Sequence, residues 1–160
     1  WVNDIFLNGR KVCGILTEGV TNSRTGRIDA AIVGIGVNIS SGESGFPGQI
    51  ASVAGSVLGA TGVDTQRSKL AAEIIREVFG IYNSGVKGIV SAMEEYREKS
   101  LLIGKTVTVS PVIGQNAENY TALVTGITGD AELVVKMTDG SEKKLESGEV
   151  SIGSLQTANL

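Results

Sequence analysis

The chain has 160 residues, a net charge of −3 and an apolar content of 41%, enough for one packed domain or two small ones. It has no histidine and one cysteine, Cys13, which excludes Ser-His-Asp triads, Cys-His dyads, histidine metal sites and an internal disulfide. No basic patch favours nucleic-acid binding, and no apolar run is long enough for a membrane helix. We therefore expect a cytoplasmic protein that acts without a membrane.

The first predicted element is a β-hairpin. Asp4–Leu7 and Arg10–Glu18 have the composition of strands, and Asn8-Gly9 between them is the strongest short hairpin signal because both residues tolerate positive φ. This hairpin holds Lys11 on a strand adjacent to the Asn3-Asp4 pair. Strand-like sequence begins at residue 2 without an initiator methionine, so we expect a piece of a longer chain.

The next segments alternate between loops and apolar runs. Residues 21–27 are polar and predict a turn, and Ile28–Ile39 is an apolar run that predicts a buried strand. Residues 40–48 predict a loop. Residues 49–58 predict a short helix with one apolar face, formed by Ile50, Val53, Ala54 and Val57.

Two further helices are predicted. Asp64 or Thr65 is a plausible N-cap of the longer one, and Gly85 and Gly88 end it. The second runs over Ile89–Lys99. Their apolar positions, which we expect to pack on a sheet or core, are Leu70, Ala71, Ile74, Ile75, Val78, Phe79 and Tyr82 in the first, and Ile89, Met93 and Tyr96 in the second.

The last third of the chain changes to short strands with tight turns. A domain boundary is expected near Ser100–Gly104, which gives domains over residues 1–102 and 103–160 and a frayed tail from Gln156. Five short strands in so few residues predict a small barrel. The predicted strands are 106–109, 120–127, 133–137, 144–145 and 150–152.

Four motifs, in order, resemble the biotin–protein ligases. Trp1-Val2-Asn3-Asp4 is similar to the Lys-Trp-Pro-Asn-Asp motif of that family, without its first lysine and with Val2 in place of proline. Arg10 to Glu18 matches the Arg-Lys-x-x-Gly-Ile-Leu-x-Glu strand. Gly34-Ile35-Gly36-Val37-Asn38 matches Gly-x-Gly-x-Asn, and Phe46-Pro47 and the closing Gly148-Glu149-Val150-Ser151 also fit.

The resemblance implies an α+β fold. We expect a mixed sheet backed by helices, an incomplete version of the class II aminoacyl-tRNA synthetase layout, followed by a small SH3-like β-barrel. The family activates biotin with ATP and Mg²⁺ to biotinoyl-5′-AMP. It then transfers biotin to a lysine of a carrier domain, typically the biotin carboxyl carrier domain of acetyl-CoA carboxylase.

The resemblance also assigns roles to individual residues. Lys11 matches the lysine that reaches the biotin carboxyl group and the phosphate, and Asn38 matches an asparagine that contacts adenine. Asn3 and Asp4 match the nucleotide and metal end. Gly14, Leu16, Gly34 and Ile35 match the wall of the biotin pocket, and Gly36 of the Gly-x-Gly-x-Asn segment is counted with the cofactor-binding residues.

The chemistry fits these residue types. A carboxylate must approach an α-phosphate, so two negative groups need a cation, and Lys11 is a point charge on a flexible stem. Mg²⁺ needs one or two carboxylates, and Asp4 is the nearest candidate for that role or for the base that deprotonates the attacking lysine. Strict alternation separates Lys11 from Gly14, so both face one pocket only if a bulge intervenes near Cys13 or the lysine reaches over an edge.

Several alternatives stay open. The Gly-Arg-Gly-Arg loop of the family is absent, so this chain is expected to be inactive or nearly so by itself. Lys11 on a hairpin is ordinarily a solvated strand residue, and Asn38 alone is a loop-capping residue. If both residues have only these ordinary roles, the chain is a non-catalytic binding or assembly module. A lipoate-ligase relative is a third possibility. Unpaired strand edges would also favour a homodimer.

Overall fold

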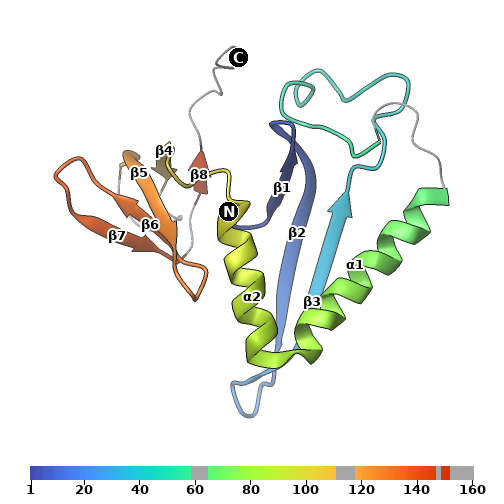
Figure 1. Ribbon diagram of the computed structural model, residues 1–160, viewed down its shortest axis with the longest axis horizontal. Coiled ribbons are helices and arrows are strands. Elements are labelled where there is room, and N and C mark those ends of the chain that lie inside the picture. The colour runs from blue at the N-terminus through green and yellow to red at the C-terminus, as the bar shows by residue number, and fades with distance from the viewer. Residues whose placement is uncertain (59–64, 111–117, 147–148, 152–160) are drawn as a thin grey trace. The chain divides into compact units, whose positions relative to one another are not determined.

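The computed structural model describes residues 1–58, 65–110, 118–146 and 149–151 (Figure 1). By their contacts these residues form two compact units: the first is Val2–Ile75, and the second takes in Trp1 and the chain from Arg76 onward. The elements are β1 Asp4–Leu7, β2 Arg10–Thr21, β3 Ile28–Val37, α1 Thr65–Asn83, α2 Gly85–Glu98, β4 Thr106–Ser110, β5 Tyr120–Ile127, β6 Leu133–Lys136, β7 Glu142–Leu145 and β8 Glu149–Ser151.

The first unit contains an antiparallel sheet in the order β1-β2-β3. The predicted hairpin is confirmed: Asn8 and Gly9 both have positive φ, 52° and 73°, as a tight two-residue turn requires. The polar turn after β2 is confirmed as well, because the Asn22 side chain accepts hydrogen bonds from the backbone N–H groups of Arg24 and Thr25. This sheet is antiparallel and not mixed, apart from one isolated parallel bridge between Lys11 and Ala54.

The β3 strand forms as predicted, but the prediction that it is buried is wrong. Nine of its ten residues are exposed, including Ile28 at 70% and Ile32 at 58%. The reason is that the described residues cover the two faces of this strand only in part, and that β2 is its only partner among the described strands. A continuous apolar run therefore marks surface that this part of the chain leaves uncovered.

The predicted helix over residues 49–58 is wrong. Pro47 and Ile50 accept hydrogen bonds from the backbone N–H groups of Ile50, Ala51 and Ala54, which closes a turn, and the chain then straightens. The carbonyl of Val53 accepts a hydrogen bond from the N–H of Lys11 instead of continuing a helix. Of the four residues expected on the inward face, only Ala54 is buried.

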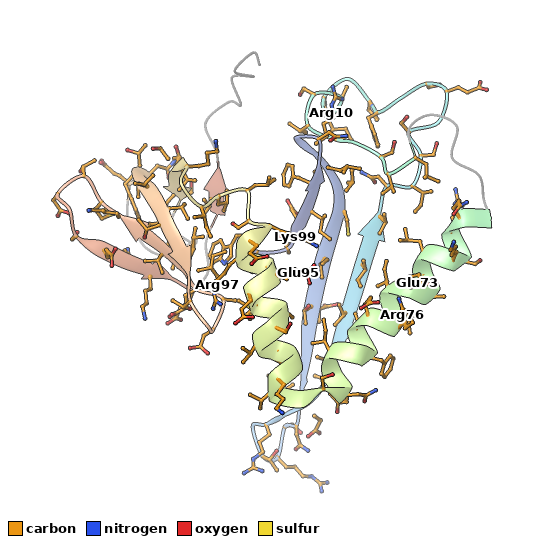
Figure 2. All side chains as sticks on the ribbon, in the orientation of Figure 1. Arg10, Glu73, Arg76, Glu95, Arg97 and Lys99 are labelled. Carbon is orange, nitrogen blue, oxygen red and sulfur yellow. The ribbon has the colours of Figure 1, made fainter. Side chains whose placement is uncertain are left out.

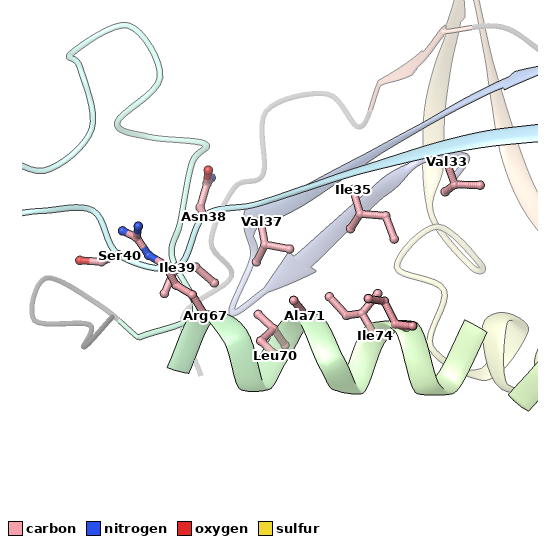
Figure 3. A pocket seen from close by; sticks show the side chains of 11 residues that line it. Val33, Ile35, Val37, Asn38, Ile39, Ser40, Arg67, Leu70, Ala71 and Ile74 are labelled. Carbon is pink, nitrogen blue, oxygen red and sulfur yellow. The ribbon is translucent and has the colours of Figure 1, made fainter. Parts of the chain in front are cut away.

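Helix α1 runs beside β3 over its first half (Figures 1 and 3). Its predicted apolar stripe is partly buried at Leu70 and Ile74, but Val78, Phe79 and Tyr82 are exposed. The stripe therefore covers the sheet only in part. The proposed N-cap Asp64 lies outside the described residues, and the helix begins at Thr65.

Helix α2 starts at Gly85, whose φ is +56°, four residues earlier than predicted. Gly88 lies within this helix and does not end α1; a Cβ atom there would lie 2.5 Å from the carbonyl oxygen of Ile81. Met93 and Tyr96 pack against the buried core of the second unit as expected, whereas Ile89 is exposed.

The second unit contains an antiparallel sheet in the order β7-β6-β5-β4-β8, which confirms all five predicted strands in their described residues. Burial alternates along these strands, as expected for a sheet with one face on a core. Among the described residues no pairing joins β7 to β8, so the closed SH3-like barrel stays a prediction, as do the domain limits at residue 102. The core residues are Leu102, Val107, Val109, Ala122, Val124, Ile127, Leu133, Val135 and Leu145.

Candidate functional site

A β-bulge brings Lys11 to the same side of the first sheet as Gly14. Ile5 pairs with Cys13 and Phe6 with Lys11, so Val12 is the extra residue in the hairpin register. A Cβ atom on Gly14 would lie 3.6 Å from Cε and 3.7 Å from Nζ of Lys11. The bulge expected near Cys13 is therefore present, and it resolves the conflict between strand alternation and a shared pocket.

Lys11 forms an ion pair with Asp4. Its Nζ lies 2.7 Å from Oδ1 of Asp4, and the two side chains are 44% and 29% exposed. Both groups therefore remain within reach of a ligand. The pair lies over Gly14, because the same carboxylate oxygen would be 3.8 Å from a Cβ atom on that residue.

Glycines continue this side of the sheet beyond the ion pair. Gly14 lies opposite Gly36, and Leu16 lies opposite Gly34. Residues directly opposite in antiparallel strands share a face, so these four lie on the side that carries Lys11 and Asp4. We call this side the glycine face: Asp4, Lys11, Gly14, Leu16, Gly34 and Gly36.

The opposite side of the sheet faces α1. Figure 3 shows Val33, Ile35 and Val37 pointing toward that helix, whereas Asn38 points away from it. Between these side chains and α1 lies a cavity of about 620 Å³, whose lining also includes the polar residues Asn38, Ser40 and Arg67. Ile35 thus lies on the other side of the sheet from Gly34 and Gly36, as strand alternation requires, and it lines the same cavity as Asn38.

Asn38 holds three segments of the backbone together. Its N–H donates to the carbonyl of Val12 at 2.8 Å, and its side-chain Nδ2 donates to the carbonyls of Gly55 at 3.1 Å and Lys11 at 3.5 Å. Its own carbonyl accepts a hydrogen bond from Val57. This is the capping role considered in the sequence, and it fixes the backbone at Lys11 and Val12.

The sequence did not indicate that the segment around Gly55 is part of the site. The backbone N–H of Lys11 donates to Val53, and the N–H of Gly55 donates to the carbonyl of Lys11, both at 2.8 Å. A Cβ atom on Gly55 would lie 2.7 Å from Cβ of Arg10, so no larger residue fits without a shift. Arg10 donates from Nη1 to the carbonyl of Ala51 at 2.9 Å (Figure 2). The only signal was a glycine after a short apolar run.

Asn3 contributes its backbone to this region. Its carbonyl accepts a hydrogen bond from the N–H of Ile15 at 2.7 Å, and its side chain is exposed. This bond extends the pairing of β1 with β2 by one step before Asp4. Asn3 therefore lies next to the ion pair, as the motif predicted, with its side chain open to solvent.

The pKa of the Cys13 thiol depends on its burial and on the charges of the nearby ion pair. Burial raises the pKa of its thiol; the Asp4 carboxylate raises it further, and Lys11 acts in the opposite direction. Only 4% of this residue is exposed, and its Sγ donates weakly to the carbonyl of Gly14. The thiol is thus a neutral packing group at physiological pH.

Few side chains of the described residues are placed to bind a metal ion. In the described parts of the chain no group of three acidic, cysteine or histidine side chains is gathered that would hold a metal ion. Asp4 offers one carboxylate, and that carboxylate is paired with Lys11. Mg²⁺ accepts one or two protein carboxylates when phosphates and waters complete its shell, so Asp4 fits as a single ligand.

No helix in the described residues is long and apolar enough to cross a lipid bilayer.

Comparison with known proteins gives a consistent result. No family model matches the chain. It is 27% identical over 157 residues to the bifunctional ligase/repressor BirA of Bacillus subtilis and to that of Bacillus spizizenii. Each alignment covers 96% of this chain and 45% of the relative, so the chain spans less than half the length of the curated relatives that it matches.

Solved structures agree in fold. The biotin protein ligase from Aquifex aeolicus in complex with biotin and ATP has a TM-score of 0.67 and 21% identity, over 94% of this chain and 59% of that chain. The apo structure of the same ligase has a TM-score of 0.69 and 21% identity, over 94% and 62%. The chain is thus similar in sequence to the BirA proteins, and it has the α+β fold of the corresponding region of a biotin protein ligase.

Proposed function

We propose that this chain, which is similar in sequence to the BirA proteins, takes part in the ATP-dependent activation of biotin and its transfer to a lysine of a biotin carboxyl carrier domain. One observation carries the proposal: the Lys11–Asp4 ion pair lies over Gly14, at one end of a face whose next residues are glycines. The sequence likeness to ligases that are more than twice as long supports it. Cytoplasmic action fits this chemistry.

Lys11 is suited to the first step. The biotin carboxylate must approach the α-phosphate of ATP, and the two groups repel each other unless a cation lies between them. The Lys11 ammonium is half-exposed, and among the described residues Asp4 is the one carboxylate that pairs with it. An incoming carboxylate or phosphate can therefore replace Asp4 as its partner, and the ammonium then stabilises the charge that builds up between the reacting groups.

Asp4 is released by the same exchange. ATP supplies the electrophilic phosphorus atom when it is bound, and Mg²⁺ supplies further positive charge. Asp4 offers one oxygen ligand to that ion or accepts the proton of the attacking lysine in the second step. A single carboxylate does not readily do both together. We therefore assign Asp4 to metal binding in the first step, and to proton acceptance in the second step, after pyrophosphate has left.

The glycine face is suited to the rest of the biotin molecule. With no Cβ at Gly14, Gly34 and Gly36, an acyl chain and a compact ring can lie directly on the sheet backbone. Leu16 adds an apolar contact, since it is 62% exposed on the same face. In this proposal Asn38 and Asn3 fix the backbone beside the nucleotide, and Ile35 supports the sheet from its other side.

The test is the loss of the Lys11 charge in the natural polypeptide that contains this sequence. Lys11→Ala is expected to lower the rate of carrier biotinylation by about 10²- to 10³-fold, the usual cost of removing one group that stabilises transition-state charge. The matched control is Lys87→Ala, an exposed lysine of α2, which should leave the rate unchanged. Near-normal biotinylation by the Lys11→Ala protein would refute the proposal.

A further inference from the structure

The cavity between β3 and α1 has apolar walls along most of its length. All the residues that line it belong to the first unit, and aliphatic side chains come from both elements, among them Val33, Ile35, Leu70, Ala71 and Ile74 (Figure 3). These walls are loosely covered, because Val33 is 50% exposed and Ile35 is 37% exposed. An apolar group that enters the cavity therefore removes aliphatic surface from water, which favours binding.

One end of the cavity is polar and positively charged. Arg67 lies in the first turn of α1, and Figure 3 shows its side chain reaching toward Ser40, which follows the end of β3. Asn38 lines the same end, but its side-chain amide is bonded to backbone carbonyls. Among the described residues that line the cavity, Arg67 is the one charged group. This end therefore favours an anion.

The Arg67 guanidinium is suited to a carboxylate. It already interacts within the protein, but a guanidinium has five N–H donors in a planar fork, which leaves donors for a ligand. A carboxylate matches this fork with two parallel hydrogen bonds. Because Arg67 is exposed, the charged group of the ligand stays in contact with water and pays little for desolvation.

The dimensions of the cavity limit the length of the apolar part. A helix rises about 1.5 Å per residue, so Arg67 and Ile74 lie about 10 Å apart along α1. An alkyl chain of medium length spans this distance when it lies along the helix. The cavity volume of about 620 Å³ is also within the usual range for small-molecule sites, about 300–1,000 Å³.

We propose that this cavity binds a medium-chain alkyl carboxylate, with its carboxylate on Arg67 and its chain between Ile35 and Ile74. The site is separate from the glycine face, since Ile35 points to the opposite side of β3. Binding there does not require Lys11. The inference therefore goes beyond the proposed function and does not depend on it.

The first experiment is calorimetry with hexanoate, octanoate and decanoate, in the natural polypeptide that contains this sequence. Affinity should rise about three- to fourfold with each added methylene group, the factor that corresponds to burying one methylene. Decanol has the same chain length as decanoate but no charge, and it should bind about two- to tenfold more weakly. Affinity that does not depend on chain length would overturn the proposal.

Substitution of Arg67 tests the charged end of the cavity. Arg67→Gln should lower the affinity for decanoate about two- to tenfold and leave the affinity for decanol unchanged, whereas Arg67→Lys should keep most of the decanoate affinity. The matched control is Lys69→Gln, which removes the same charge at an exposed position of α1 outside the cavity. Equal losses in the Arg67→Gln and Lys69→Gln proteins would contradict a carboxylate held by Arg67.

Filling the cavity tests its apolar part. Ala71→Phe places a ring in the cavity and should weaken decanoate binding about tenfold or more, the factor for losing the burial of two methylene groups. Ala72→Phe, at the next exposed position of α1, does not line the cavity and should bind decanoate normally. Thermal unfolding shows whether both variants fold. Normal decanoate binding by Ala71→Phe overturns the proposal. Self-association that Ala71→Phe abolishes, without any decanoate binding, also overturns it and assigns the cavity to a second copy of the chain.

The Lys11→Ala protein separates this inference from the proposed function, because a carboxylate with an apolar chain also suits Lys11 and the glycine face. We expect Lys11→Ala to bind decanoate normally, and we expect biotin not to displace decanoate. Loss of decanoate binding in Lys11→Ala, or displacement by biotin, would place decanoate on the glycine face and overturn the inference. If decanoate binding depends on Arg67 and Ala71 while Lys11→Ala biotinylates the carrier normally, the inference holds and the proposed function fails.

Discussion

At the scale of single residues, the charges of Lys11 and Asp4 in the candidate site neutralise each other through their ion pair. Each group is the other's partner at 2.7 Å, and both side chains are partly exposed. An anionic ligand must therefore compete with Asp4 for the lysine. Because of this competition, the Asp4 carboxylate is expected to weaken the binding of an anionic ligand, although it is needed for the reaction rate.

Asp4→Asn should separate those effects. Without the competing carboxylate, biotin in the absence of nucleotide is expected to bind about two- to fivefold tighter, in line with the small worth of an exposed ion pair. Biotin transfer should slow, because a metal ligand and base is lost. Calorimetry and a carrier-biotinylation assay measure the two quantities in the natural polypeptide. Glu94→Gln, at an exposed carboxylate of α2, is the control, and weaker biotin binding by Asp4→Asn would contradict this account.

Gly36→Ala tests the glycine face at one position. The nearest atom to the new Cβ is the carbonyl oxygen of Gly14 at 3.8 Å, so the fold should lose less than about 0.5 kcal/mol. Biotin binding should weaken, since the methyl group occupies the surface of the strand. Gly19→Ala, on the opposite face of the same sheet, serves as the control. Thermal unfolding combined with calorimetry decides the matter, and equal biotin affinity in both variants would argue against the face as a binding surface.

Ala131→Gly tests the strain in the β5–β6 turn. Glycine adopts a φ of +64° without steric cost, so we expect the free energy of unfolding to rise by about 1 kcal/mol. Chemical denaturation measures it. Destabilisation by this substitution would mean that the Cβ atom of Ala131 has a packing role that outweighs the backbone strain.

At the scale of elements, the connection between α1 and α2 depends on a close approach at Gly88. A Cβ atom there would lie 2.5 Å from the carbonyl oxygen of Ile81 and 2.7 Å from Cβ of Ser84. The first turn of α2 therefore fits against the end of α1 only with a glycine at position 88. The sequence marked this glycine as a helix breaker, whereas its role is to let two helices meet.

Gly88→Ala is expected to destabilise the chain by about 1–3 kcal/mol, because overpacking outweighs the gain in helix propensity. Gly80→Ala provides the matched comparison in α1, where a Cβ atom meets nothing within 4 Å, and should stabilise by up to about 1 kcal/mol. Urea denaturation of both variants tests the pair. An equal response of the two would show that the contact with Ile81 relaxes at no cost.

Tyr96 on α2 gives the second unit a pH dependence at its alkaline end. Burial raises the pKa of its hydroxyl above the ordinary value of 10.0. The unfolded chain then loses this proton at lower pH than the folded chain, so stability is full below that value and falls as the pH rises through the folded pKa. The difference in unfolding free energy between the unmodified chain and Tyr96→Phe should shrink or reverse in favour of the variant over this range.

How far the sequence predicts each element depends on what surrounds it. The hairpin at Asn8-Gly9 and the β5 strand are fixed by turn chemistry and local alternation. β5 was predicted with correct limits, and the second hairpin strand runs three residues beyond its predicted end at Glu18. Residues 49–58 have the apolar spacing of a helix, but Lys11 competes for their backbone through a tertiary hydrogen bond. The bulge at Val12 was expected only because two site residues otherwise faced opposite ways. Gly55 gave only a weak local signal, a glycine after a short apolar run.

At the scale of the whole molecule, the two units differ in how they are stabilised. The second unit has a continuous buried core around Val124 and Leu133, which are fully buried. In the first unit only Val12, Cys13 and Ala54 are buried among the described residues. The apolar side chains of β3 are therefore exposed, and we expect another protein surface to cover them.

We expect the chain to self-associate in solution through this surface, as a dimer or larger species. Ile32→Lys, at a side chain that is 58% exposed, should shift the population toward monomer by placing a charge on the apolar strand. Light scattering at micromolar concentration measures the mass of each protein. A clean monomer for the unmodified chain would dispose of this expectation.

The most direct test of the central claim is a crystal structure of the natural polypeptide that contains this sequence, with biotin and ATP bound. We predict that the biotin carboxylate lies within ion-pair distance of Lys11 Nζ and that its ring lies on the glycine face next to Gly14 and Gly36. Biotin bound on the opposite side of the sheet, between Ile35 and α1, with Lys11 still held by Asp4, would contradict the account.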